Sequence, residues 1–189
     1  LKIPTGEEVN LTIDDLKSPR TSYVSSKIVG EVACNNFSLI HKLPITILRF
    51  HNLYGPRMGC FGVIPDMFGK ILQSSEIDVF APDHTRDFSY IDDVVRMTID
   101  LCENEKAIGE LFNIGNPKEE ITIKDLVLNI AEVMNRQITI IEKLDTSGAT
   151  PRRCADTSKL EKILGYQVST SIKEGLKETY EWHLINRKK

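Results

Sequence analysis

The fold is decided by residues 18–50, which read SPRTSYVSSKIVGEVACNNFSLIHKLPITILRF. Ser18 precedes a proline and offers a helix start, after which apolar side chains recur at near-helical spacing as far as His41. Pro44 ends that helix. Residues 45–50 follow as a run rich in β-branched side chains, which indicates a buried strand.

Candidate helices and strands alternate through the rest of the chain. After a loop expected over 51–63, strands are expected over 77–80, 88–91, 111–114 and 138–141. Helices are expected over 64–72, from Asp92 or Asp93 to 105, over 122–134, from Thr157 or Ser158 to 165, and from 171 onward. Two of them begin at capping-box patterns, Thr122 with Asp125 and Ser171 with Glu174. This alternation predicts an α/β protein.

Length and composition exclude several classes of protein. A chain of 189 residues suits one domain or a large fragment of a two-domain enzyme. Its 24 basic and 27 acidic residues give a net charge of −3, which offers no electrostatic footprint for nucleic acid or an anionic membrane. No run approaches the about 18 apolar residues of a spanning helix. Neither a nucleic-acid partner nor a membrane partner is expected.

The cysteines and histidines carry no metal or disulfide signature. The four cysteines are widely spaced without a C-x-x-C pair, and the four histidines lack ligand spacing. We therefore expect reduced thiols, a cytoplasmic location and no structural metal.

Tyr23 and Lys27 form the first candidate catalytic pair. They are four residues apart on the first predicted helix, so they share one face. A lysine ammonium beside a phenol lowers the pKa of the phenol and makes it a usable general base. The alternative is an ordinary exposed helix face.

Further blocks give this pair a context. In chain order they are residues 22–27 (SYVSSK), 49–57 (RFHNLYGPR), 86–94 (RDFSYIDDV), 112–115 (FNIG), 155–159 (ADTSK) and 164–166 (LGY). Their order and spacing resemble the extended short-chain dehydrogenases/reductases, the NAD-dependent epimerases and dehydratases that act on nucleotide sugars. The resemblance covers nearly the whole chain.

The resemblance implies a fold and a division of the chain. It implies the C-terminal part of a Rossmann-type parallel sheet, with a smaller mixed α/β substrate-binding domain. Residues 1–57 would be a remnant of the NAD-binding Rossmann domain with the tyrosine–lysine helix. Residues 58–189 would mainly bind the nucleotide sugar, with some segments returning to the Rossmann sheet.

It also implies roles for the catalytic pair. Tyr23 matches the catalytic tyrosine, which removes a proton from a sugar hydroxyl as hydride leaves the same carbon for NAD. Lys27 matches the lysine that holds the nicotinamide ribose and favours the tyrosinate. Both are therefore expected to be catalytic and to contact the cofactor NAD.

Two residues match positions on the diphosphate side of the substrate. Arg86 matches the arginine that grips the diphosphate, a task that suits a guanidinium because its fork binds phosphate oxygens bidentately. Its alternative is a surface ion pair with Asp87 or Asp92. Asn52 matches an asparagine near the same group, and its alternative is a turn asparagine.

Three further substrate residues are expected on weaker grounds. Ile64 and Phe80 lie in segments that resemble those lining the base pocket, with core packing as an equal alternative. Thr146 stands where many relatives carry an arginine, so Arg153, or its neighbour Arg152, is expected to supply the positive charge. A satisfied buried imidazole is the favoured interpretation of His51, which is assigned no role.

The cofactor half of the family fold has no counterpart in the sequence. A Rossmann half needs a glycine-rich turn between a strand and a helix to receive the pyrophosphate. Gly55, Gly59 and Gly62 do not qualify, because a long loop with a proline separates the strand ending at residue 50 from the next helix. The catalytic serine or threonine and the acidic pair of dehydratases are also missing. The chain alone is therefore expected to be inactive.

Several functions stay open. Transient C4 oxidation with 4-epimerisation is favoured over 4,6-dehydration, and UDP-glucuronate decarboxylation comes third. A non-catalytic nucleotide-sugar-binding or interaction module is the alternative from another class. The partner is expected to be a nucleotide-diphosphate sugar. By analogy, a homodimer is expected through the tyrosine–lysine helix and the helix over 92–105.

Overall fold

The computed structural model describes residues 2–13, 15–59, 61–144, 149–165, 168 and 170–186. It contains the helices α1 (Thr21–His41), α2 (Val63–Gln73), α3 (Ile91–Cys102), α4 (Ile123–Val133), α5 (Ser158–Leu164) and α6 (Ile172–Asn186). The strands are β1 (Ile47–Phe50), β2 (Asn52–Tyr54), β3 (Glu76–Phe80), β4 (Thr85–Tyr90), β5 (Leu111–Ile114), β6 (Glu120–Thr122), β7 (Thr139–Lys143) and β8 (Arg152–Arg153). The predicted α/β class is confirmed. Thr146 and Tyr166 lie outside the described residues.

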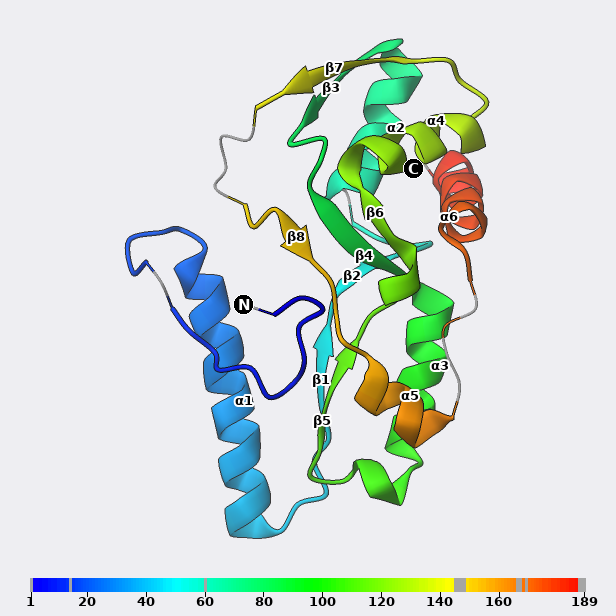
Figure 1. Cartoon of the computed structure of the whole chain (residues 1–189). Helices are drawn as coiled ribbons and strands as arrows, with labels where there is room; N and C mark the ends of the chain where they lie inside the picture. Colours follow the sequence, from blue (N-terminus) through cyan, green and yellow to red (C-terminus); the bar gives the residue numbers. More distant parts are fainter. Residues whose placement is uncertain are drawn as a thin grey trace.

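The strands form three small groups (Figure 1). In the first, β1 pairs with β5 in parallel. In the second, β4 is central, with β2 and β8 parallel to it and β6 antiparallel. In the third, β3 pairs with β7 in parallel. Strand β4 is the only described strand with three neighbours. It therefore brings together three parts of the chain, those that contain β2, β6 and β8.

Two hydrophobic clusters hold the elements together. One lies between α3, α5 and β5 and consists of the buried residues Val94, Met97, Leu101, Ala107, Phe112, Ile114 and Leu160. The larger one gathers apolar side chains from α2, α4 and α6 around β2, β3 and β4, among them Ile64, Phe68, Leu126, Val127, Ile130 and Leu176. Helix α1 contributes to neither cluster, because none of its residues is buried.

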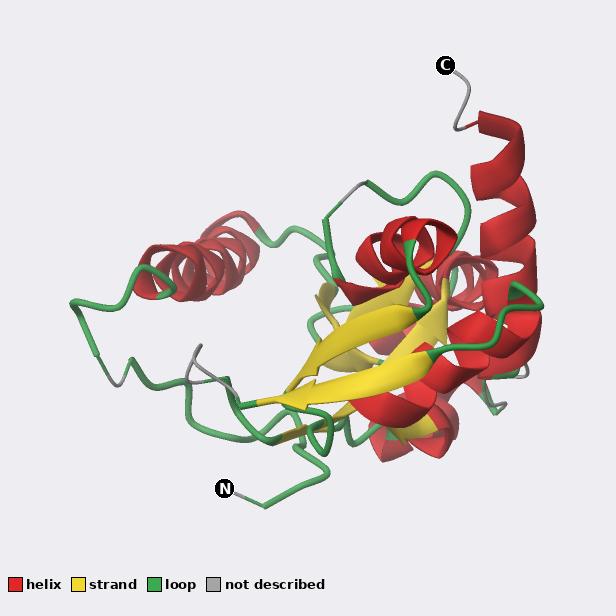
Figure 2. Ribbon diagram, turned by 90° about the horizontal axis from the view of Figure 1, so that it is seen from above, coloured by secondary structure: helices red, strands yellow, loops and turns green. Residues whose placement is uncertain are grey.

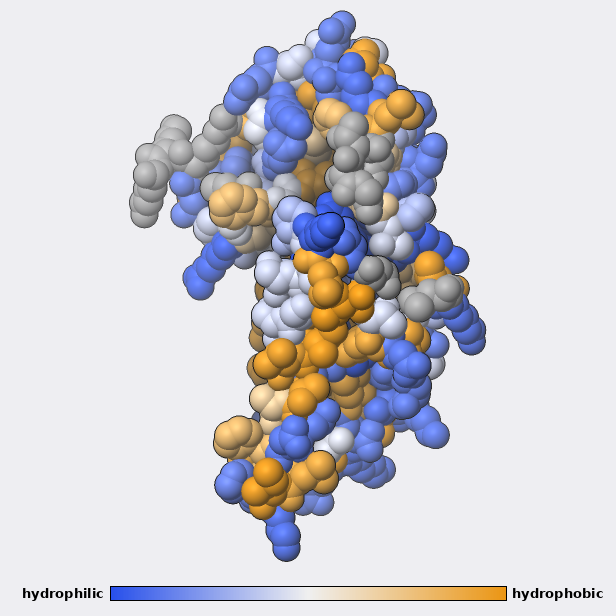
Figure 3. Space-filling view, turned by 90° about the vertical axis from the view of Figure 1, so that its left-hand side faces the viewer, coloured by the Kyte–Doolittle hydropathy of each residue, from blue (hydrophilic) through white to orange (hydrophobic). Residues whose placement is uncertain are grey.

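Helix α1 stands apart from the other helices. Figures 1 and 2 both show it on one side of β1 and β5, while α3 and α5 lie on the other side. Hydrophobic side chains gather in a band on the face of the molecule that includes α1 (Figure 3). The exposed apolar residues of α1 include Val29, Val32, Phe37, Leu39 and Ile40. None of the described helices is both long and apolar enough to cross a bilayer.

Both predicted capping boxes are confirmed. Thr122 Oγ1 accepts a hydrogen bond from the backbone N–H of Asp125 at 2.9 Å, which starts α4. At α6, the Glu174 carboxylate accepts from the backbone N–H of Ser171 at 2.9 Å, and Ser171 Oγ accepts from the N–H of Glu174 at 3.3 Å. These bonds satisfy amide groups that the first helical turn leaves without partners.

Three short strands, β2, β6 and β8, were not predicted. The expected loop over 51–63 begins with β2, and the polar segment before α5 contains β8. Strands of two or three residues are too short to show a period, and all three depend on pairing with β4. The strand expected over 45–50 begins at Ile47. Among the described residues it pairs only with β5, so the edge of β1 that faces away from β5 is unpaired.

Candidate functional site

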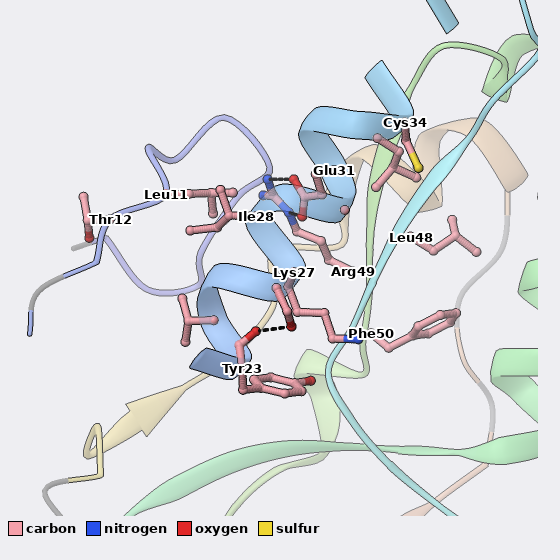
Figure 4. Close-up of a pocket in the computed structure, with 14 residues that line it drawn as sticks. Leu11, Thr12, Tyr23, Lys27, Ile28, Glu31, Cys34, Leu48, Arg49 and Phe50 are labelled. Carbon is pink, nitrogen blue, oxygen red and sulfur yellow. Dashed lines mark hydrogen bonds and ion pairs between the residues drawn. The ribbon is translucent and has the colours of Figure 1, made fainter. Parts of the chain in front are cut away.

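Tyr23 and Lys27 lie side by side in the first two turns of α1, on the wall of a cavity between α1 and β1 (Figure 4). The Lys27 ammonium is 5.3 Å from the centroid of the Tyr23 ring. Tyr23 is 67% exposed, so its phenol is open to a ligand. The cavity has a volume of about 560 Å³, and Leu48 and Phe50 of β1 line its opposite wall.

An ion pair fixes α1 against β1. Arg49 donates from Nε and Nη2 to the two carboxylate oxygens of Glu31 at 2.8 and 2.7 Å, and from Nη1 to the backbone oxygen of Glu7 at 3.1 Å. The hydrogen bond to Glu31 raises the pKa of Arg49 above its usual value. This bidentate pair links the helix that carries Tyr23 to the strand behind it. Arg49 lies in the matched block 49–57, but neither residue was assigned a role from the sequence.

The register of β4 brings Arg86 and Arg153 together. Arg86 of β4 lies opposite Arg153 of β8, although they are far apart in the chain, and Asn52 of β2 lies opposite Phe88. Paired residues share a face of the sheet, and alternate residues along β4 share that face too. Arg86 and Arg153 therefore project from one face, as a common diphosphate site would require. The Asn52 amide lies beside them but turns toward Asp87, with Nδ2 3.0 Å from its backbone oxygen and 3.5 Å from Oδ1.

The two arginines of β8 are in different situations. Arg152 donates to both carboxylate oxygens of Glu120 at 2.7 and 2.8 Å, and this contact lowers the pKa of Glu120 to about 2. Arg153 points to the other face, is exposed and has no hydrogen-bond or ion-pair partner among the described residues. Arg86 donates from Nη1 to the backbone oxygens of Thr85 and Pro151 at 2.6 and 3.1 Å. Of the two arginines of β8, Arg153 is therefore the one whose guanidinium can contact a ligand.

Asn52 and His51 both contact Asp87, a residue for which the sequence suggested only a possible ion pair with Arg86. Asn52 Nδ2 donates to the backbone oxygen of Asp87 at 3.0 Å, and His51 Nδ1 lies 3.2 Å from Asp87 Oδ1. Asp87 is fully buried. The only signal for Asp87 in the sequence was its place directly after Arg86 in the matched block 86–94. Burial itself could not be predicted there.

The two expected base-pocket residues differ in exposure. Ile64 is 1% exposed and belongs to the larger hydrophobic cluster, so core packing accounts for its side chain. Phe80 is 53% exposed at the end of β3 and lines a cavity of about 410 Å³ with Phe61, which is 93% exposed. Two exposed aromatic rings beside one cavity offer a surface on which a nucleobase could stack.

Among the described residues, candidate NAD-binding side chains are found for one end of the cofactor only. Tyr23 and Lys27 are the two residues that the family resemblance assigns to the nicotinamide ribose. The three glycines of the loop between β2 and α2 are spread over residues 55–62, so the described part of the loop is no tight strand–helix turn for a pyrophosphate. Within the described ranges, no group of three or more metal-ligating side chains could hold an ion. Burial raises the pKa of the Cys154 thiol to about 12, so it stays protonated.

An α/β fold with a tyrosine–lysine pair on a cavity-facing helix defines a dehydrogenase-like class. The family model described as GDP-mannose 4,6 dehydratase matches residues 5–179. The chain belongs to this family of NAD-dependent nucleotide-sugar epimerases and dehydratases, within the short-chain dehydrogenases/reductases.

Curated relatives include two with different activities. The chain is 34% identical over 173 residues to UDP-N-acetyl-alpha-D-glucosaminuronate decarboxylase of Bacillus cytotoxicus, covering 86% of this chain and 53% of that protein. It is 30% identical over 209 residues to UDP-glucuronate 4-epimerase 4 of Arabidopsis thaliana, covering 97% of this chain and 44% of that protein. The chain thus spans about half the length of the curated relatives that it matches.

Solved structures show the same relationship. UDP-glucuronic acid 4-epimerase from Bacillus cereus, in complex with NAD, superposes with a TM-score of 0.79 at 29% identity, covering 94% of this chain and 53% of that one. The epimerase Mth375 from Methanothermobacter thermautotrophicus superposes with a TM-score of 0.82 at 26% identity, covering 91% of this chain and 52% of that one. The predicted family and fold class are therefore confirmed.

Proposed function

We propose that the whole protein is an NAD-dependent nucleotide-sugar 4-epimerase that oxidises C4 of the sugar transiently. The observation that carries this proposal is the pairing of Tyr23 with Lys27 on the wall of an open cavity. An exposed phenol beside an ammonium can accept a proton from a bound hydroxyl, and neither group is tied into the hydrophobic core.

The residues of the chain would share the chemistry as follows. Tyr23 takes the proton of the C4 hydroxyl as the carbonyl forms, and gives it back when C4 is reduced from the other face. The Lys27 ammonium stabilises the negative charge that develops on the phenol oxygen. NAD, when bound, accepts the C4 hydride and returns it. Lys27 would also hold the nicotinamide ribose.

The sheet face along β4 would bind the rest of the substrate. Arg86 and Arg153 present two guanidinium groups on one face, which suits the two negative phosphates of a nucleoside diphosphate. Asn52 adds an amide next to them, at the start of β2. Phe80 and Phe61 would stack on the base at the neighbouring cavity.

UDP-glucuronate is the substrate to test first. The names of several relatives point to UDP-linked uronic acids, including the 4-epimerases of Arabidopsis thaliana and of Bacillus cereus. A nucleotide sugar of this kind has a diphosphate for the arginine face and a C4 hydroxyl for the phenol. Each part of this substrate therefore has a proposed binding group in the chain.

A second candidate is decarboxylation of the same type of substrate. Its support is the uronate decarboxylase of Bacillus cytotoxicus, which is 34% identical to this chain. Oxidation at C4 makes the carboxylate at C5 a β-keto acid, which loses CO₂ readily. The same Tyr23 would therefore serve either outcome, and only the product distinguishes them.

The experiment is product analysis with the whole protein, NAD and UDP-glucuronate, with UDP-glucose as a parallel substrate. Epimerisation gives the galacturonate 4-epimer with no loss of mass. Decarboxylation releases CO₂ and leaves a UDP-pentose. Recovery of unchanged UDP-glucuronate and UDP-glucose, under conditions in which the protein is folded and binds NAD, would contradict the proposal.

We also propose that the protein is a homodimer. Exposed apolar residues lie on α1 and, on the other side of β1 and β5, on α3, where Val95 and Ile99 are 48% and 52% exposed. Apolar bands of this kind favour association with a second copy. Light scattering on the wild type and on Ile99→Asp tests this, with a dimer expected for the wild type and more monomer for the variant. A monomeric wild type would contradict it.

A further inference from the structure

Asp87 follows Arg86 on β4 and has none of its surface exposed. A carboxylate without partners is very unfavourable in such a place, because its charge loses hydration. Here Oδ1 lies 3.2 Å from Nδ1 of His51, and Oδ2 accepts a hydrogen bond from the backbone N–H of Ala155 at 3.0 Å. The carboxylate thus adds side-chain contacts between segments that the strand pairing of β2, β4 and β8 already brings together.

The groups around Asp87 come from separate parts of the chain. His51 joins β1 to β2, Ala155 follows β8, and Asn52 of β2 donates to the backbone oxygen of Asp87 at 3.0 Å. Gly115 follows β5, and a Cβ atom there would lie 2.7 Å from Oδ2 of Asp87. The close approach of the β5 end to the carboxylate therefore requires a glycine.

Three of the joined segments carry the residues proposed to bind the diphosphate. Asn52 contacts Asp87 itself, Arg86 precedes it, and Arg153 lies two residues before Ala155. Side chains alternate along a strand, so the Asp87 carboxylate lies on the face of β4 opposite to Arg86. It can set the spacing of these groups without touching the ligand.

We propose that Asp87 is a positioning residue, which holds Asn52, Arg86 and Arg153 at the spacing that the diphosphate of a nucleotide sugar requires. The inference rests on the proposed function, because it assumes that these three residues bind the substrate. The Asp87 carboxylate lies on the face of β4 opposite to Arg86, and the spacing of the three binding residues depends on it.

The test is a double-mutant cycle on UDP binding by the whole protein, measured by titration calorimetry with UDP alone. Asp87→Asn keeps the shape of the side chain but removes its charge, and we expect UDP to bind about tenfold more weakly. Arg153→Ala should weaken binding about tenfold in the wild type but less than about threefold in the Asp87→Asn background, where the guanidinium is no longer held in place. Equal losses in both backgrounds, or unchanged affinity in Asp87→Asn, would overturn the inference.

Asp93 offers a matched control. It is also a buried carboxylate, and its partners are Arg96 Nη2 at 2.6 Å and the backbone N–H of Thr170 at 3.0 Å. Since it lies on α3, away from the paired segments of β4 and β8, Asp93→Asn should leave the UDP affinity within about twofold even if it lowers Tm. If it weakens UDP binding as much as Asp87→Asn, general destabilisation explains both variants and the positioning role is wrong.

A second variant covers the case in which Asp87→Asn does not fold. His51→Ala removes one partner and leaves the carboxylate bonded to Ala155, so the same cycle with Arg153→Ala should show smaller but still unequal losses. Equal losses would overturn the positioning role. A wild-type protein that fails to bind UDP overturns the proposed function itself, which differs from a wild type that binds UDP while the cycle is additive.

Discussion

Helices α1 and α4 are held in opposite ways. The 21 residues of α1 include no buried one, and the helix is linked to β1 by the Arg49–Glu31 pair. In the 11 residues of α4, Leu126, Val127 and Ile130 are fully buried in the larger hydrophobic cluster. Helix α4 therefore depends on apolar packing, whereas α1 depends largely on polar contacts around one arginine.

The comparison separates the two parts of the proposed chemistry. The pair that would carry proton transfer, Tyr23 and Lys27, lies on the weakly packed helix. The residues that would hold the diphosphate lie on β2, β4 and β8, and β4 is flanked by both other strands. Elements with few buried contacts open most easily, so α1 should be the least stable helix of the described chain. Binding and turnover should therefore respond to different substitutions.

The largest expected effect is on turnover. In the whole protein, Tyr23→Phe should lower kcat about 10²–10⁴-fold, since it removes the proposed general base, while UDP affinity stays unchanged. Steady-state assays with UDP-glucuronate and calorimetry with UDP would measure the two quantities. Tyr180→Phe, which removes a hydroxyl on α6 far from the cavity between α1 and β1, is the control. A Tyr23→Phe enzyme with more than half of wild-type turnover would remove the catalytic role from α1.

Hydrogen exchange tests the difference in packing directly. In the 189-residue chain, backbone amides in the middle of α1 should exchange at least about 100-fold faster than those of Leu126–Ile130 in α4, because α1 can open without disrupting a hydrophobic cluster. Mass spectrometry of peptic peptides would measure both sets in one sample. Equal protection of the two helices would show that the contrast in burial has no energetic meaning.

The next effect is on binding. Arg86→Ala should weaken UDP binding by about ten- to hundredfold, because it removes a charge-assisted contact to phosphate oxygens. The exposed Arg136→Ala, which removes the same charge elsewhere, should leave the dissociation constant unchanged. If both variants bind UDP alike, the face along β4 is not the diphosphate site. The substrate would then not be bound by a part of the chain separate from the helix that carries Tyr23.

The smallest effect concerns pH and stability. The Arg152 contact lowers the pKa of Glu120 from its usual 4.5 to about 2. A lowered pKa contributes stability above the usual value, and the contribution is lost as pH falls from about 4.5 through 2. Glu120→Gln should therefore lower the urea midpoint at pH 7, and its difference from wild type should shrink toward pH 2. A difference that stays constant over this range, or that Glu181→Gln reproduces, would contradict this.

The sequence predicted the elements that have a period of their own. Helix α1, strand β1 and both capping boxes follow from local patterns around Ser18, Pro44, Thr122 and Ser171. Strands β2, β6 and β8 were missed because two or three residues show no period, and they are strands only because they pair with β4. Local pattern carries no information about such pairing.

The site was predictable to a similar extent. Motif resemblance selected Arg86 and Arg153, but their common face follows only from the register of β4 and β8. It also selected Ile64, whose burial depends on the packing of α2 and could not be derived from its neighbours. Asp87 was missed as a separate contributor, since a carboxylate next to an arginine suggests a surface pair. Its actual partners come from residues 51 and 155.

In the proposed reaction, hydride leaves C4 of the sugar and returns to it while Tyr23 moves the proton. UDP-glucuronate deuterated at C4, incubated with the whole protein and NAD, tests it most directly. Mass spectrometry and NMR of the product should find the deuterium still at C4, with Tyr23→Phe forming about 10²–10⁴-fold less product at the same time. Product that has exchanged its C4 deuterium for solvent hydrogen, or full turnover by Tyr23→Phe, would contradict the account.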